Sequence, residues 1–289
     1  MEQTKGLIKF VLLFIFLLFS SRLVKIVFGL FGIIYTSDNL FLYSIIDLTA
    51  SVVISTTAII LYRRNLGKDF KELIKDKSEI PTFFATVIAA YVGVLIIEIF
   101  CGQIVEAIGS LFHVATEEAK NQTMVESIVQ ASPLIMAIST ILFAPLEEEL
   151  IFRCGIRNTI KNKGVFIAVS GLFFGLLHIT GNYILLGLVL ISGFIVSKLL
   201  ESNNKYKIWL SVVTVVVAII LFFIAMILIN HGLSNYLNTI NISEALNGIT
   251  YITLGMYLAG IYAYTDNIYY PMFTHLLING FATILLLLK

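Results

Sequence analysis

The chain has few of the charged residues that soluble proteins carry on their surfaces. Charged residues make up 13% of its 289 residues, against roughly 25% in a typical soluble domain. Hydrophobic residues make up 58%. This balance excludes a soluble enzyme, a disordered protein and a coiled coil, and it leaves a polytopic membrane protein.

Other scarce features exclude further classes. The chain has only 4 prolines, which argues against a Pro-rich linker. Its 2 cysteines, Cys101 and Cys154, rule out a disulfide scaffold and a Cys-rich metal site. The net charge of +1 gives no sign of a nucleic-acid partner. Neither a Gly-x-Ser-x-Gly nucleophile motif nor a His-Glu-x-x-His zinc helix occurs in the sequence.

Long apolar runs dominate what is present. A helix needs about 20 mostly apolar residues to span a bilayer, and such runs predict spans at 7–34, 40–62, 80–108, 131–155, 164–180, 183–200, 208–230, 248–264 and 268–288. The runs are too long for the strands of a barrel. The predicted fold is therefore all-α, a polytopic transmembrane helical bundle of about eight or nine spans.

Basic residues predict the orientation of these spans. Lysines and arginines cluster in 63–77, after the second span, and again in 157–163 and 205–207. Since such clusters favour the cytoplasmic side, the N-terminus is expected in the cytoplasm. Segment 64–79 is expected to be either an amphipathic surface helix or an ordinary cytoplasmic loop.

Span 131–155 contains charges that a membrane helix normally lacks. Glu147, Glu148, Glu149 and Arg153 follow an apolar run, and each charge at mid-membrane costs at least ~2.5 kcal/mol. Glu149 and Arg153 are four residues apart, so they can form an ion pair on one helix face. Glu148 points roughly 100° away around the helix, which makes it the better candidate for a reactive carboxylate.

Two histidines are predicted at a similar depth in the membrane. Glu148 and His178 lie on either side of a predicted turn at Asn162, each roughly 20–24 Å from it along its own helix. His275 enters the membrane by ~14 Å from the same side. Asn279 shares a helix face with His275, because the two are four residues apart. Four polar side chains are thus expected to converge inside the bilayer.

The chemistry of this set is that of amide hydrolysis without a covalent intermediate. A carboxylate beside an imidazole can hold a water molecule and remove its proton. A second histidine with an asparagine offers donors for a developing oxyanion. Glu148, His178 and His275 are also a suitable ligand set for zinc. The sequence leaves open whether the water is bound by a metal or activated by the carboxylate.

Three motifs, in order along the chain, carry a resemblance to a known family. They are Glu148-Glu149-x-x-x-Arg153, Phe174-x-x-x-His178 and His275-x-x-x-Asn279. Together they resemble the CPBP intramembrane protease family, also called the Abi family, which contains the type II CAAX prenyl endopeptidases. The resemblance covers roughly residues 131–182 and 248–282.

The resemblance implies roles for the matching residues. Glu148 would activate water together with His178, while His275 and Asn279 would polarise the scissile carbonyl or hold its oxyanion. The implied supporting residues are Glu149, Arg153 and Phe174. Family members have been described both as metalloproteases and as glutamate-dependent peptidases, so no cofactor is assigned and a divalent metal such as zinc stays open.

The resemblance also divides the chain. Residues 1–130 are expected to form N-terminal membrane spans, and 131–289 a CPBP-like catalytic membrane domain with an inserted pair of spans at 183–247. Because the number of added spans is even, the final helices keep the membrane orientation that they would have without the insertion. One departure is Cys154, which stands where the family usually has Gly directly after the motif arginine.

The leading interpretation is an intramembrane endopeptidase that cuts membrane-proximal or lipid-modified peptides in a bacterial plasma membrane. Its expected partners are a membrane peptide or protein substrate and the lipid bilayer. One alternative is a non-catalytic membrane scaffold or regulator, for example in bacteriocin immunity or signalling. Another is a transporter with a proton relay, which the lack of an inverted repeat in the sequence disfavours.

Overall fold

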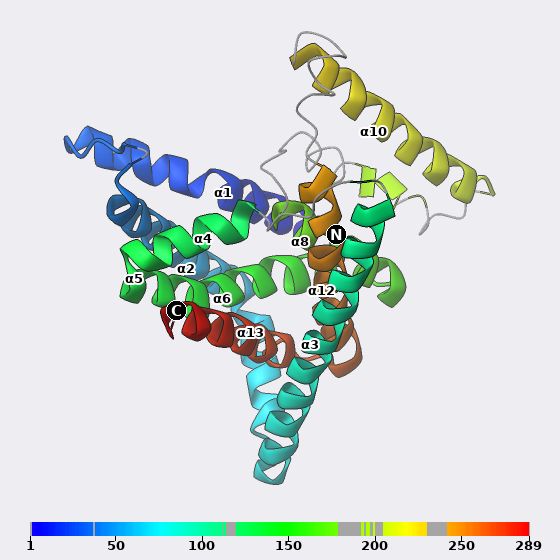
Figure 1. The fold of residues 1–289 in the computed structure, drawn as a ribbon. Helices are drawn as coiled ribbons and strands as arrows, with labels where there is room; N and C mark the ends of the chain where they lie inside the picture. The colour runs from blue at the N-terminus through cyan, green and yellow to red at the C-terminus, as the bar shows by residue number, and fades with distance from the viewer. Residues whose placement is uncertain are drawn as a thin grey trace.

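The computed structural model describes residues 2–36, 38–111, 113, 120–178, 192–193, 195–196, 199, 205–229 and 242–288. Their regular structure is entirely helical, which confirms the predicted all-α class. The longer helices are α1 (Glu2–Leu30), α2 (Leu40–Leu73), α3 (Ile80–Leu111), α4 (Lys120–Ala131), α8 (Lys163–His178), α10 (Lys207–Ile229), α12 (Ile242–Thr265) and α13 (Tyr269–Leu288) (Figure 1).

Several helices are suited to a membrane. Within the described residues, four are long and apolar enough to cross one, namely Lys5–Leu30, Leu40–Leu73, Lys77–Leu111 and Tyr269–Leu288. Many of their large hydrophobic side chains are exposed, as lipid-facing surfaces require. An integral membrane protein is therefore supported, whereas the count of eight or nine spans stays a prediction. The predicted span 183–200 lies mostly outside the described residues.

Segment 64–79, predicted to be either an amphipathic surface helix or a loop, is largely helical and mostly exposed. Its first ten residues continue α2 without a break to Leu73. The buried Asp69 provides a reason, because it ties this part of α2 to the turn between α12 and α13. Asp69 Oδ2 accepts a hydrogen bond from Ile268 N at 3.0 Å, and Asn267 Nδ2 donates to Asp69 O at 2.9 Å. These bonds fix the start of α13, the helix that carries His275.

The helix that carries the acidic motif is irregular, although a single regular α-helix was expected over 131–155. It consists of α5 (Pro133–Ile138), the π-helix η2 (Ser139–Phe143), α6 (Ala144–Glu149), the π-helix η3 (Leu150–Gly155) and α7 (Ile156–Thr159). Pro145 has no N–H to donate, and the preceding Ala144 N–H bonds to Ser139 O, five residues back. Such π segments occur frequently at functional sites.

Aromatic side chains pack this helix against α1 and α8. Phe14 meets Phe152 edge-on with ring centroids 6.0 Å apart, and Phe10 and Phe14 both meet Phe173 edge-on at 5.8 and 5.6 Å. All four rings are at most 3% exposed. Edge-on contacts between buried rings add to the stabilisation from burial itself. They fix η3 and α8 relative to each other.

Glycines bring α8 and α12 into backbone contact. A Cβ atom at Gly175 would lie 2.7 Å from Ile252 N and 2.8 Å from Ile252 Cα, and one at Gly171 would lie 2.7 Å from Met256 N. No other residue type fits at these distances. The spacing Gly171-x-x-x-Gly175 is the small-xxx-small pattern by which membrane helices approach closely. It holds the end of α8, and therefore His178, against α12.

Candidate active site

Glu148, His178 and His275 come from three helices and meet in one place. Glu148 belongs to α6, His178 is the last residue of α8, and His275 lies in α13. Glu148 Oε2 is 3.9 Å from His178 Nε2 and 4.0 Å from His275 Nε2. Their side chains are 13%, 17% and 4% exposed, respectively. The cluster is thus largely buried but still reachable at Glu148 and His178.

The His178 ring is held on three sides. Its Nδ1 atom lies 2.8 Å from the carbonyl oxygen of Phe174, one turn earlier in α8. The imidazole stacks on the Phe174 ring with centroids 4.5 Å apart and on the Tyr251 ring of α12 with centroids 5.0 Å apart. This sandwich restricts the ring to one orientation, in which Nε2 faces Glu148.

His275 is held by the second carboxylate of the motif. Its Nδ1 atom lies 3.0 Å from Glu149 Oε1. The other oxygen of Glu149 lies 2.9 Å from Arg153 Nε, and both of these side chains are 0% exposed. The ion pair expected between Glu149 and Arg153 is therefore present, and it extends to His275.

Arg153 has further contacts that fix its guanidinium. Its Nη1 atom donates to Ser170 Oγ at 3.0 Å, and Ser170 Oγ donates in turn to Phe152 O at 3.0 Å. The guanidinium carbon lies 5.0 Å from the centroid of the Phe174 ring, within the range of a cation–π interaction. Because Phe174 also contacts His178, it links the two halves of the site.

These contacts determine which atoms of the site donate hydrogen bonds and which accept them. A carbonyl or carboxylate oxygen can only accept a hydrogen bond, so Nδ1 of each histidine is the donor. In the neutral imidazole the Nε2 atom is then an acceptor. Glu148 Oε2, which has no hydrogen-bond partner, and His178 Nε2, 3.9 Å away, therefore offer two acceptors to a position between them, whereas His275 Nε2 becomes a donor when its ring carries a second proton. A water molecule, which donates two hydrogen bonds, suits such a position.

The atoms of the cluster lie further apart than the ligands of a zinc site, although the ligand types suit zinc. Two ligands of a tetrahedral zinc at ~2.1 Å lie about 3.4 Å apart, which is shorter than the 3.9 and 4.0 Å seen here. Among the described residues, no three His, Cys, Asp or Glu side chains are arranged to hold a metal ion. As arranged, the cluster does not fit a tetrahedral zinc, and it does fit a bridging water.

The part of the chain that carries the first two motifs also matches a known protein family. Residues 130–214 match the family model described as type II CAAX prenyl endopeptidase Rce1-like. The predicted resemblance to the CPBP family is confirmed. The match contains the first two CPBP motifs and ends before the third, at His275 and Asn279. Neither a curated protein nor a solved structure matches the chain.

The two residues of the third CPBP motif have different surroundings. His275 faces Glu148, whereas Asn279 Nδ2 donates to the carbonyl oxygen of Thr140 at 2.9 Å. Thr140 lies in the π-helix η2, where the regular pattern of backbone hydrogen bonds is interrupted. Asn279 thus joins α13 to the irregular helix 133–159, which carries the acidic motif. Its amide nitrogen carries a second N–H, which leaves one donor for another partner.

Two residues with contacts in the site were not predicted. Ser170 stands four residues before Phe174 and eight before His178, so helical spacing could have indicated it. Tyr251 lies far from every motif along the chain, and no pattern in the sequence indicates that it stacks on His178. Only the packing of α8 against α12 brings it there.

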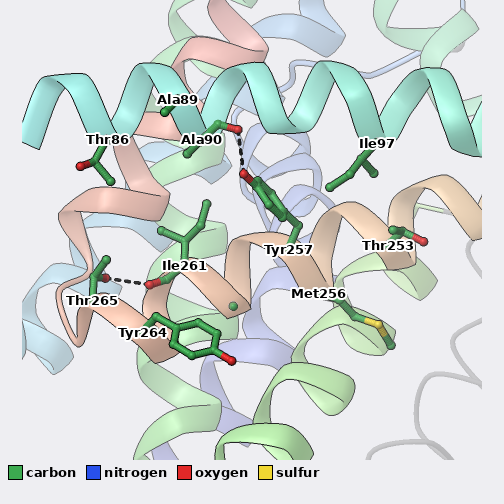
Figure 2. Close-up of a pocket in the computed structure, with 11 residues that line it drawn as sticks. Thr86, Ala89, Ala90, Ile97, Thr253, Met256, Tyr257, Ile261, Tyr264 and Thr265 are labelled. Carbon is green, nitrogen blue, oxygen red and sulfur yellow. Dashed lines mark hydrogen bonds between the residues drawn. The ribbon is translucent and has the colours of Figure 1, made fainter.

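A separate groove of about 660 Å³ lies between α3 and α12. Figure 2 shows Thr86, Ala90 and Ile97 of α3 opposite Thr253 and Tyr257 of α12, with Tyr257 OH donating to Ala90 O at 3.2 Å. The lining is mostly apolar and contains none of the predicted catalytic or supporting residues. The groove is therefore distinct from the candidate active site.

Proposed function

We propose that this protein is an intramembrane endopeptidase in which Glu148 activates a water molecule for attack on a peptide bond. The observation that carries the proposal is the convergence of Glu148 Oε2 with His178 Nε2 and His275 Nε2, at 3.9 and 4.0 Å. A water bonded to each atom at ~2.8 Å spans such separations. The match to the Rce1-like family model supports the same activity at the level of the family.

In the first step the water donates hydrogen bonds to Glu148 and His178. Its oxygen attacks the carbonyl carbon of the scissile bond, one proton passes to Glu148, and the carbonyl electrons move onto oxygen. General-base assistance of this kind typically accelerates a reaction by ~10²–10⁴. His178 is suited to this role because its Nδ1 is occupied by Phe174 O, so that Nε2 is free to accept from water.

His275 is proposed to stabilise the resulting oxyanion. As an imidazolium it donates from Nδ1 to Glu149 and from Nε2 to the oxyanion. Glu149 stabilises this cation, as a carboxylate does for the histidine of a serine-protease triad, and Arg153 holds Glu149 in place. The second N–H of Asn279 is proposed as a further donor, and one such donor is worth about 10²–10³ in rate.

The intermediate then breaks down without a covalent enzyme adduct. Glu148 gives its proton to the leaving nitrogen while the carbon–nitrogen bond breaks. The products are a carboxylic acid, which ionises, and an amine, and Glu148 returns to its carboxylate form. One water is consumed, and no oxidant, reductant or second substrate is required.

The proposed substrates are membrane-proximal or lipid-modified peptides in a bacterial plasma membrane. Glu148 and His178 are partly exposed within a set of apolar helices, which suits a chain that approaches from the bilayer. Prenylated CAAX peptides are the substrate class named in the matching family description. A non-catalytic scaffold is the alternative, and it predicts that Glu148→Gln leaves the biological role intact.

Comparison of peptide termini in membranes tests the proposal. Cells that produce wild-type protein, Glu148→Gln or Glu98→Gln would be analysed by mass spectrometry of membrane peptides. Glu98 is an exposed acid of α3 and serves as the control. New termini are expected with the wild type and with Glu98→Gln, while the uncut precursor accumulates with Glu148→Gln. The same termini in all three samples would contradict a peptidase.

A further inference from the structure

The groove of about 660 Å³ between α3 and α12 has the size and length of a site for a lipid chain. Pockets that bind small ligands have volumes of roughly 300–1,000 Å³. Thr86, Tyr264 and Thr265 line one end of the groove, and Ile97 and Thr253 line the other (Figure 2). The helical rise from Thr253 to Thr265 is ~18 Å. This length is close to the ~15 Å of one leaflet of the hydrocarbon core.

Small side chains keep the groove open, while one tyrosine fixes its two walls. Ala89 of α3 and Gly260 of α12 line the groove, and a Cβ atom added at Gly260 would meet nothing within 4 Å. Tyr257 of α12 reaches across to α3, where its OH donates to Ala90 O at 3.2 Å. A Cβ atom at Gly93 would lie 2.9 Å from Tyr257 Cζ. The two helices are thus joined at Tyr257, and the space beside Gly260 is free for a ligand.

One end of the groove lies at the predicted cytoplasmic side. The basic segments 63–77 and 157–163 are predicted to face the cytoplasm, and the structure brings both to the end of α12. Asp69, in the first segment, is hydrogen-bonded to the turn after α12. Lys163, in the second, has its Nζ atom 5.6 Å from the centroid of the Tyr264 ring. Tyr264 is 81% exposed, and tyrosines are enriched at the level of the lipid headgroups. The groove therefore runs from this level into the cytoplasmic leaflet.

The headgroup end of the groove carries an excess of positive charge. Lys161 and Lys163 are exposed at the start of α8, against one exposed acid, Asp266, in the turn after α12. Neither lysine forms an ion pair with another described residue. Basic side chains at this level attract the headgroups of anionic lipids. The groove thus combines an apolar length with a cationic end, which matches one chain and the phosphate of an anionic phospholipid.

We propose that the groove binds one acyl chain of an anionic phospholipid from the cytoplasmic leaflet, with the phosphate of that lipid at Lys163. Within a bilayer the chain gains packing contacts and no hydrophobic burial, because the lipid around it is equally apolar. Any phospholipid chain fits the groove on these grounds. The charge of the headgroup therefore selects the lipid, and a zwitterionic lipid binds more weakly than an anionic one.

The proposed lipid stabilises a helix that also supports the candidate active site. Met256 of α12 lines the groove and packs against Gly171 of α8. Tyr251, in the same helix, stacks on the His178 ring with centroids 5.0 Å apart. A lipid bound between α3 and α12 holds α12 in this position. Because it binds the folded protein and not the unfolded chain, it should raise the melting temperature.

Thermal unfolding of the delipidated protein in detergent tests the site without any peptide substrate. The melting temperature is measured as phosphatidylglycerol, or phosphatidylcholine with the same chains, is added. Phosphatidylglycerol is expected to raise it by about 5 °C at a hundredfold excess over the dissociation constant, and phosphatidylcholine by less. Added NaCl should reduce the difference between the two lipids, because exposed charges are screened. Native mass spectrometry should show one phosphatidylglycerol per chain.

Matched variants locate the lipid. Gly260→Leu fills the groove and should abolish the lipid-dependent rise, whereas Gly102→Leu adds the same side chain to an open position of α3 and should retain it. Lys163→Gln should weaken binding of phosphatidylglycerol about 5-fold and leave binding of phosphatidylcholine unchanged. Lys71→Gln, which alters an exposed lysine of α2, should affect neither lipid. If Gly260→Leu does not fold, Ala89→Leu fills the groove from the opposite wall and supplies the test.

Three results would overturn the proposal. An equal rise with both lipids would show that the headgroup charge selects nothing. A wild-type response in Gly260→Leu and Ala89→Leu would place the lipid elsewhere. Displacement of phosphatidylglycerol by a lipid-modified peptide would assign the groove to a substrate. Because none of these measurements involves cleavage, the lipid site and the proposed peptidase activity can fail independently.

Discussion

His275 Nδ1 lies 3.0 Å from Glu149 Oε1, and this contact ties the candidate active site to a fully buried ion pair. The second oxygen of Glu149 is 2.9 Å from Arg153 Nε. The orientation of His275 therefore depends on Arg153 through their shared partner Glu149. The Glu-Glu-x-x-x-Arg motif thus carries one carboxylate toward the water position and another toward the histidine.

Arg153→Ala is expected to lower both folding and activity. Removal of one partner of a buried pair leaves an uncompensated charge and costs about 3–5 kcal/mol. The amount of folded protein and its melting temperature in detergent measure this loss. Arg63→Ala, which alters an exposed arginine of α2, is the control. Normal yield and melting temperature for Arg153→Ala would show that the pair has no structural role.

Gly175→Ala is expected to push α8 away from α12. The added Cβ would lie 2.7 Å from a backbone nitrogen of α12, and overpacking of this kind costs about 1–3 kcal/mol. Gly102→Ala is a suitable control, because a Cβ there meets nothing within 4 Å. Thermal unfolding of both variants gives the comparison. Equal melting temperatures would contradict the backbone contact described here.

Tyr251→Leu should slow cleavage, while Tyr251→Phe should leave it nearly unchanged. Phenylalanine keeps the ring that stacks on His178, and leucine does not. Stacked pairs are worth about 0.5–1.5 kcal/mol, so kcat is expected to fall about 2- to 10-fold with little change in KM. A loss that appears only in KM would indicate a contact with substrate instead of an effect on His178.

Asn279→Ala should leave more activity than loss of the catalytic base does. One oxyanion donor is worth about 10²–10³ in rate, and some stability should also be lost because Asn279 Nδ2 bonds Thr140 O. Thr283→Val separates the two effects, since Thr283 lies on the same helix and contacts the Thr140 hydroxyl at 3.2 Å. Similar losses of activity in both variants would reduce Asn279 to a purely structural residue.

The features that the sequence predicts best are those that follow from the regular geometry of a helix. Apolar runs predict the helices, and the distances of Glu148 and His178 from the turn near Asn162 predict their equal depth. A helix advances by a fixed rise per residue, so these estimates are robust to errors of a few residues. The ion pair of Glu149 and Arg153 follows from the same periodicity.

Other features depend on packing that no local pattern encodes. The π segments on either side of α6 displace side chains from their regular positions, so the bond from Asn279 to Thr140 O was not expected. The stacking of Tyr251 on His178 depends on the close approach of α8 and α12. The burial of Glu147 against α2 depends on which helix lies beside the motif.

The most direct test of the proposed mechanism is the cleavage rate of purified Glu148→Gln on a membrane peptide that the wild type cuts. Glutamine keeps the size of glutamate but cannot act as a base at neutral pH. The rate is expected to fall by ~10²–10⁴ with an unchanged melting temperature, and a double variant with His178→Ala should be scarcely slower. Cleavage by Glu148→Gln at the wild-type rate would contradict the assignment of Glu148 as the base.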